Sequence, residues 1–183
     1  MVEQKEDSIS VEEFRHANIS LILDSYNDIF SSFDARSFSE KSLSVDFLDE
    51  CKRAARDKDE TDLELILSIP KSKRNLSDEF KIKKRLKDHF KHHSIEKEQE
   101  AIKMRREGQL WAVLGALLIL GITYGFVVFE SVFMQSVLTI FEIPGWFLVW
   151  EGMSKIFIDS RKIEPDYLFY KKMSEAHIIF RGY

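Results

Sequence analysis

Residues 110–129 form a run of twenty amino acids without a charged side chain, and this run limits the possible folds more than any other feature. At about 1.5 Å of rise per residue, a helix of this length spans roughly 30 Å, the thickness of the hydrocarbon core of a bilayer. Core helices of soluble proteins are seldom this long and apolar on every face. The run therefore predicts a transmembrane helix.

A second apolar run, residues 131–150, follows the first after Glu130. A connection this short makes two helices antiparallel neighbours in space. The two runs therefore predict a transmembrane hairpin over residues 110–150.

Basic side chains flank the predicted hairpin on both sides, whereas its turn carries no Lys or Arg. The positive-inside rule then places both ends of the hairpin in the cytoplasm. Residues 1–7 are polar and acidic, which predicts that no cleaved signal peptide precedes the domain. We therefore expect a multi-pass protein of the cell (inner) membrane with both termini cytoplasmic. The basic residues that we expect to contact lipid head groups are Lys103, Arg105, Arg106 and Lys155.

Charge is distributed unevenly along the chain, although 32% of all residues are charged. Residues 71–106 are clearly basic and directly precede the first apolar run, where positive charge attracts anionic lipids. Nucleic acid could bind the same charges, but their position beside the bilayer favours lipid. We therefore expect the lipid bilayer as a partner and no nucleic acid.

Small residues are frequent in the first apolar run, and Gly121 and Gly125 have the spacing of a GxxxG motif. This spacing lets two helix backbones approach each other closely. The sequence leaves open whether the packing partner is the second apolar run or another subunit.

Glu142 lies near the middle of the second apolar run, where an ionisable side chain costs about 2.5–3.5 kcal/mol on insertion scales. Pro144 removes a backbone donor two residues later and, together with Gly145, predicts a kink. Three interpretations are open for the carboxyl group. It could form a hydrogen bond within a helix bundle, take part in the passage of ions or protons, or lie near an interface if the second helix begins later.

Residues 1–74 predict a small cytoplasmic α+β domain. Apolar residues recur at helical spacing over residues 19–33, and residues 44–58 predict a second helix. Ser10 and Glu13 could form a capping box upstream of the first of these helices.

Residues 62–70 alternate in hydrophobicity and form the one convincing strand of the chain. A lone strand leaves its backbone groups unpaired, so this strand needs a partner. We expect the partner to come from residues 34–43 or from another copy of the chain.

A helical pattern begins at Asn75, and no Pro or Gly interrupts it before Gly108. This basic helix, residues 75–109, leads to the membrane and can continue directly into the first apolar run. After the hairpin, residues 151–183 predict a cytoplasmic interfacial segment.

The C-terminal segment contains a helical pattern that starts at Pro165 and includes Ile179 and Phe180. Its lysines and aromatic residues suit a helix that lies along the inner leaflet. Docking on the cytoplasmic domain is equally compatible with the pattern.

The titratable residues suggest neither a metal centre nor a reactive thiol. His89 and His93 have the four-residue spacing of a two-ligand pair, but no pattern of carboxylates or cysteines completes a site. Solvated or interfacial histidines are therefore the favoured interpretation. Cys51 is the single cysteine and reads as one position on a charged helix. We expect no metal and no cofactor.

Several short motifs follow one another along the chain. Ile29-Phe30 and Phe33-Asp34 precede the helix of residues 44–58, and the strand LELILSIP comes next. The second apolar run ends with Gly145-Trp146 and Trp150, and Ile156-Phe157-Ile158-Asp159 follows it. Over residues 27–175 this order resembles a family of prokaryotic membrane proteins with two transmembrane helices and an uncharacterised function. The chain lacks the dense arginine tail common in that family, and the resemblance implies a shared fold and no activity.

Together these features predict a mainly α membrane protein, a transmembrane hairpin with a small cytoplasmic α+β domain. The leading hypothesis is a non-enzymatic homo-oligomer whose cytoplasmic domain assembles or senses, with an unknown protein as a possible partner. The alternative is a channel or membrane-permeabilising effector with Glu142 and Pro144 near the path. An enzyme is disfavoured because the sequence shows no nucleophile elbow, phosphate loop or paired catalytic carboxylates.

Overall fold

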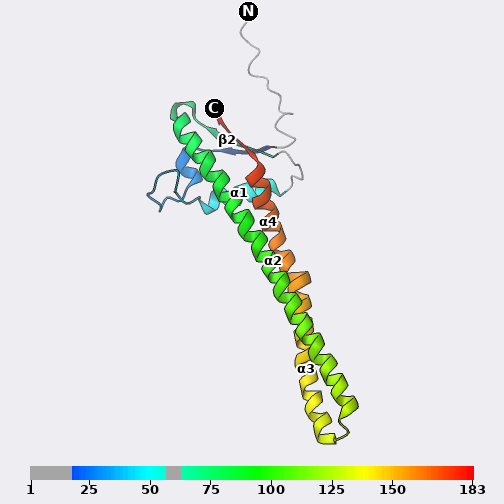
Figure 1. Ribbon diagram of the computed structural model, residues 1–183. Coiled ribbons are helices and arrows are strands. Elements are labelled where there is room, and N and C mark those ends of the chain that lie inside the picture. The colour runs from blue at the N-terminus through cyan, green and yellow to red at the C-terminus, as the bar shows by residue number, and fades with distance from the viewer. Residues whose placement is uncertain (1–17, 57–62) are drawn as a thin grey trace, which may run out of the picture. The chain divides into compact units, whose positions relative to one another are not determined.

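The computed structural model describes residues 18–56 and 63–183, and it is mostly helical with one small sheet (Figure 1). The chain divides into two units. The N-terminal unit joins the residues up to Ser94 to Leu168–Tyr183, and the hairpin unit comprises Ile95–Tyr167. The divisions expected from the sequence differ from these because the last sixteen residues belong to the N-terminal unit.

The sheet of the N-terminal unit has three parallel strands in the order β1-β2-β3, namely β1 (Asn18–Ile22), β2 (Glu64–Ile69) and β3 (His177–Gly182). The strand predicted over residues 62–70 is confirmed as β2, although Leu63 and Pro70 flank the strand and Asp62 lies outside the described residues. Its expected partners were wrong. β2 pairs on both sides within the chain, with β1 and with β3, and not with residues 34–43.

Two helical predictions were wrong in part because short strands occupy some of their residues, whereas α4 (Ser160–Glu175) confirms the C-terminal helical pattern from Pro165 to Glu175. Ile19 of β1 and Leu23, the residue after β1, lie on the same face of the strand and are buried. Ile22 lies on the other face and is 76% exposed. Pairing with β2 therefore prevails over the helical spacing of the apolar residues. Ile179 and Phe180 likewise belong to β3 and not to a C-terminal helix. The capping box proposed at Ser10 lies outside the described residues.

The helix predicted over residues 44–58 is confirmed as α1, although residues 57 and 58 lie outside the described part. The basic helix from Asn75 continues without a break into the first apolar run, as the sequence allowed, and the side chain of Asn75 accepts a hydrogen bond from the Ser77 N–H at 3.0 Å. The helical elements are η1 (Tyr26–Ile29), α1 (Val45–Ala55), η2 (Lys71–Lys73), α2 (Leu76–Val128), α3 (Val132–Ser154), the π-helical η3 (Lys155–Asp159) and α4 (Ser160–Glu175).

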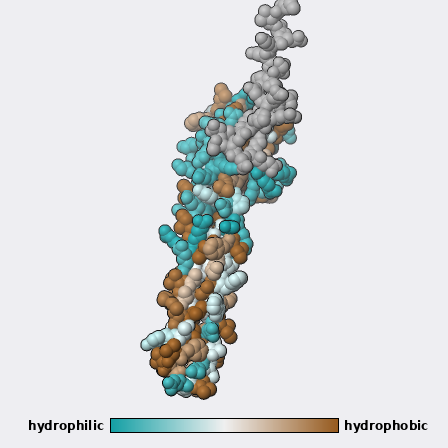
Figure 2. Space-filling view, turned by 90° about the vertical axis from the view of Figure 1, so that its right-hand side faces the viewer, coloured by the Kyte–Doolittle hydropathy of each residue, from teal (hydrophilic) through white to brown (hydrophobic). Residues whose placement is uncertain are grey.

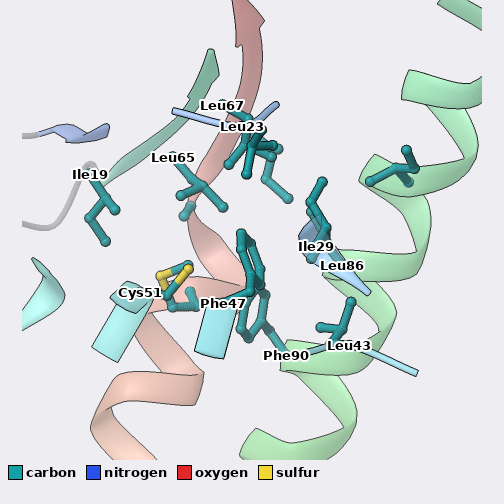
Figure 3. Close-up of a cluster of buried hydrophobic side chains, with 14 of the residues drawn as sticks. Ile19, Leu23, Ile29, Leu43, Phe47, Cys51, Leu65, Leu67, Leu86 and Phe90 are labelled. Atoms are coloured by element: carbon teal, nitrogen blue, oxygen red, sulfur yellow. The ribbon is translucent and has the colours of Figure 1, made fainter. Parts of the chain in front are cut away.

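The core of the N-terminal unit lies on one face of the sheet, where α1, the first part of α2 and the end of α4 supply apolar side chains (Figure 3). Cys51 of α1 is fully buried in this cluster. Burial raises the pKa of its thiol to about 12, so the thiol is protonated at neutral pH and unreactive. The side chains that Figure 3 labels are Ile19, Leu23, Ile29, Leu43, Phe47, Cys51, Leu65, Leu67, Leu86 and Phe90.

A buried polar network fixes the start of α2 to the segment after β1. The Tyr26 hydroxyl donates to Glu79 Oε1 at 3.0 Å and accepts from the Asn75 N–H at 2.8 Å. Arg74 donates to both carboxylate oxygens of Glu79, at 2.8 and 3.0 Å. These hydrogen bonds from Arg74 hold the pKa of Glu79 below its usual range, although Glu79 is only 4% exposed.

His89 lies where α2 packs against α4 within the N-terminal unit. Its Nε2 atom is buried and has no hydrogen-bond partner among the described residues. Its ring centroid lies 4.4 Å from that of His93 and 6.3 Å from that of Tyr170. Burial, followed by the positive charge of His93 and Arg85, lowers the pKa of His89 to about 4. The side chain is therefore a neutral, interfacial imidazole at neutral pH.

The N-terminal unit is expected to lose stability as the pH falls from about 6.5 to about 4. In this window the unfolded chain binds a proton at His89 that the folded unit excludes, so protonation favours unfolding. Urea midpoints at pH about 7 and about 5 measure the effect, with labelling of Cys51 by a disulfide reagent that reacts at acidic pH as the readout. His89→Leu should flatten the pH dependence, whereas the exposed His92→Leu should retain it. Equal pH dependence in both variants would contradict the assignment to His89.

Candidate functional site in the apolar hairpin

Glycines line the contact between α2 and α3 in the hairpin unit, where the two helices run antiparallel (Figure 1). A Cβ atom on Gly115 would lie 2.6 Å from the backbone nitrogen of Val149, and one on Gly152 would overlap the backbone nitrogen of Ala112. The backbones thus approach more closely than any side chain larger than hydrogen permits at these positions. We call this contact the glycine seam.

The glycine seam has a regular register. Gly108 and Gly115 on α2, and Gly145 and Gly152 on α3, are each seven residues apart, the repeat that keeps one helix face on its partner. Gly145 contacts Ile119, and towards the turn Gly125 contacts Leu138. Glu142 falls between these contacts, at the level of Ile122.

The two glycines of the GxxxG motif, Gly121 and Gly125, lie in different environments. A Cβ atom on Gly125 would lie 3.0 Å from Leu138 Cδ1, so this glycine belongs to the glycine seam. Gly121 has open space where its Cβ atom would be, and it faces away from α3. The glycines that make the closest approach, Gly115 and Gly152, were not among the packing residues chosen from the sequence. Their seven-residue spacing was the signal that could have identified them.

Glu142 lies on the glycine seam side of α3 and is half-buried. Within the described part of the chain, its carboxyl group has no hydrogen bond or ion pair. Ile122, at the same level of α2, is only 5% exposed. Pro144 is exposed inside α3, which remains one continuous helix through Pro144 and Gly145. The two neighbours therefore differ, because Gly145 packs against Ile119 while Pro144 faces outwards.

Polar contacts mark the end of the hairpin opposite the turn. Lys155 Nζ lies 3.3 Å from Glu107 Oε2 and 5.9 Å from the centroid of the Trp111 ring. This half-buried ion pair joins α2 to the start of η3. The other three basic residues chosen from the sequence, Lys103, Arg105 and Arg106, are exposed on α2 within about one turn before Glu107. All four basic residues therefore lie beyond the same end of the apolar region.

The outer surface of the hairpin is largely apolar. Among the described residues, each apolar helix packs against one other helix, so side chains such as Val127 and Ile143 are 78% and 73% exposed. Figure 2 shows the hydrophobic residues gathered over the hairpin helices, on the face in view. Both helices are long and apolar enough to cross a membrane. A contiguous apolar surface of this extent requires lipid or protein to cover it.

Hydroxyl and amide groups on this apolar surface are bonded within their own hairpin. Thr123, Ser136 and Thr139 each donate to the carbonyl oxygen four residues earlier, and Gln135 donates to the carbonyl oxygen of Phe129. Tyr124 is different, because it is 70% exposed and its hydroxyl has no partner among residues 18–56 and 63–183. Away from the turn residues Glu130 and Ser131, Tyr124 and Glu142 are therefore side chains of the hairpin helices whose hydroxyl and carboxyl groups have no partner among the residues that the structure describes.

No family model, curated protein or solved structure matches the chain. The described residues also contain no group of three or more His, Cys, Asp or Glu side chains placed to hold a metal ion. The properties of the hairpin itself are therefore the basis for a functional proposal.

Proposed function

We propose that the protein is an integral membrane homo-oligomer whose hairpin spans the bilayer and whose N-terminal unit assembles or senses in the cytoplasm. The observation that supports this proposal is the continuous apolar surface of α2 and α3. In the most apolar stretch of 18 residues of each helix, only 17% and 6% of the residues are buried. In water this surface would be unfavourable by about 25 cal/mol for each Å² exposed. Lipid removes that cost over the whole circumference of the hairpin.

The distribution of charge supports an orientation with both chain ends on the cytoplasmic side. Lys103, Arg105, Arg106 and Lys155 lie at one end of the apolar region, and the turn at residues 129–131 carries no basic residue. The Glu107–Lys155 pair with Trp111 suits the boundary between hydrocarbon and head groups, where indole rings are enriched. On the same grounds we propose that the hairpin spans the cell (inner) membrane.

Exposed apolar side chains on the N-terminal unit support a role in binding another protein. Phe33 is 99% exposed and lies in a turn, and the next residue, Asp34, accepts hydrogen bonds from Arg36 and from the Ser42 N–H. Leu76 and Phe80 are also largely exposed, one turn apart on α2. Features of this kind suit assembly or sensing without catalysis.

A channel or permeabilising effector is the alternative, and one observation bears on it. Glu142 is half-buried beside the glycine seam, and a path for ions would have to bring water to that position. Within the hairpin, α2 and α3 are packed too closely there to leave such a path between them, so a path would have to form between subunits.

Membrane insertion and orientation can be tested on the full chain with Cys51→Ala, which removes the single native thiol. We expect the protein to remain in the membrane fraction after extraction at alkaline pH. An added Ser131→Cys should react with an impermeant maleimide from outside intact cells. An added Lys103→Cys is the matched control and should react only after permeabilisation. Release by alkaline extraction would contradict insertion, and labelling of both positions from the same side would contradict the hairpin.

A further inference from the structure

Tyr124 and Glu142 both lie inside the apolar helices without a partner among the described residues, and they are chemically complementary. Tyr124 of α2 offers a hydroxyl donor, and Glu142 of α3 offers a carboxyl oxygen that accepts a hydrogen bond whether or not the group is protonated. Every other hydroxyl and amide side chain between residues 110 and 150, apart from Ser131, donates within its own hairpin. In hydrocarbon an unmade hydrogen bond is costly because water is absent.

The register of the glycine seam brings these two residues to nearly the same level. Gly145 contacts Ile119 and Leu138 contacts Gly125, which places Glu142 level with Ile122. Tyr124 is two residues nearer to the turn, a difference of about 3 Å along the helix.

The directions of the Tyr124 and Glu142 side chains remove this difference in height. Side chains of helical residues lean towards the N-terminus of their helix. α2 runs towards the turn, so Tyr124 leans away from it. α3 runs away from the turn, so Glu142 leans towards it. The phenol and the carboxyl group therefore converge on one level, and this level is common to all copies of the chain that share one orientation in the membrane.

The two groups do not meet within one chain. Tyr124 is 70% exposed on the outside of α2, whereas Glu142 is half-buried beside the glycine seam. Gly121, one turn from Tyr124, has open space where its Cβ atom would be, so a neighbouring helix can approach the backbone there. The outward face of α2 around Gly121 and Tyr124 thus suits a second helix that carries an acceptor.

We infer that the hairpins associate side by side, with the Tyr124 hydroxyl of one copy donating to the Glu142 carboxyl of the next. This inference rests on the proposed function, because it requires hairpins inserted in one orientation. The contact joins two different faces of the hairpin, so each copy can donate to one neighbour and accept from another. A closed ring of copies would satisfy every Tyr124 and every Glu142.

The test compares association of full-length chains in lipid bilayers, measured by energy transfer between donor- and acceptor-labelled copies as lipid is added. Tyr124→Phe and Glu142→Leu each remove one partner and keep an apolar side chain of similar size. We expect either substitution to weaken association roughly tenfold, as loss of one interhelical hydrogen bond does. The double variant should be no weaker than the single variants, since both remove the same bond.

Thr139→Val is the matched control, because the Thr139 hydroxyl donates to Gln135 in its own helix. This variant should associate like the wild type. If the single variants associate like the wild type, or if their effects on association add in the double variant, the Tyr124–Glu142 pair is overturned. The proposed homo-oligomer would remain intact. A wild-type chain that stays monomeric at every lipid ratio would overturn the homo-oligomer itself. Tryptophan emission during thermal unfolding verifies that each variant keeps its hairpin.

Cross-linking of introduced cysteines by a short bis-maleimide gives a second measure, which reports which faces of two copies lie close together. In chains that carry Cys51→Ala, copies with Tyr124→Cys should cross-link to copies with Glu142→Cys more than either cross-links to itself. Phe126 lies on the opposite face of α2 at a similar level, so Phe126→Cys should not cross-link to Glu142→Cys. Equal cross-linking from Phe126→Cys and Tyr124→Cys would overturn the assigned face.

Discussion

Gly152→Ala is expected to destabilise the hairpin, because the added methyl group has no room against the other helix. At Gly152 the Cβ atom would overlap the backbone nitrogen of Ala112 and lie 2.6 Å from the carbonyl oxygen of Gly108. Backbone atoms cannot move aside as a flexible side chain can, so α2 and α3 must separate. Overpacking of this kind costs about 1–3 kcal/mol. Gly115→Ala should act in the same direction, since its Cβ atom would lie 2.6 Å from the Val149 backbone nitrogen.

Gly121→Ala is the matched control for this prediction. It makes the same chemical change on α2, the helix that carries Gly115, but nothing lies within 4 Å of the added atom. Alanine is also the better helix former by about 1 kcal/mol, so in detergent dilute enough to keep the chains monomeric this variant should be as stable as the wild type or slightly more stable. All three tryptophans of the chain, Trp111, Trp146 and Trp150, lie in the hairpin helices. Thermal unfolding followed by tryptophan emission therefore reports on the hairpin, and equal midpoints for Gly152→Ala and Gly121→Ala would contradict the close approach of the helices.

The sequence was informative where a pattern is long or chemically exclusive. Twenty uncharged residues identify an apolar helix on their own, and the alternation in residues 62–70 identified β2. The strands β1 and β3 were not predicted because they are short, and five or six residues fit helical and alternating patterns almost equally well. Their pairing partner lies far away in the chain, so no local signal could decide between helix and strand.

The candidate site was predicted in part. Glu142 stood out because a carboxylate in an apolar run is costly, but the sequence could not tell which face of α3 carries it. That face follows from the register of the glycine seam, which depends on contacts between two helices. The GxxxG motif was ambiguous for the same reason, since Gly125 contacts Leu138 while Gly121 faces outwards. Tyr124 was missed because an exposed tyrosine becomes informative only when its level relative to Glu142 is known.

Phe90→Ala is expected to destabilise the N-terminal unit by about 3–5 kcal/mol, the usual cost of removing a buried phenylalanine. Phe90 is fully buried on α2 and packs edge to face with Phe169 of α4, with ring centroids 6.1 Å apart. It therefore joins the first part of α2 to the end of α4, which leads directly into β3. A cavity at this position removes contacts between α2 and α4, and the loss is a large part of the stability of a typical domain.

Phe80→Ala provides the comparison, because Phe80 lies on the same helix and is 72% exposed. Its removal should change the free energy of unfolding by no more than about 0.5 kcal/mol. Cys51 supplies a local readout, since its thiol is buried in the same core as Phe90 and is the single cysteine of the chain. In urea, Cys51 of Phe90→Ala should become reactive at a clearly lower concentration than Cys51 of Phe80→Ala. Equal labelling midpoints would mean that Phe90 does not hold α4 against the core.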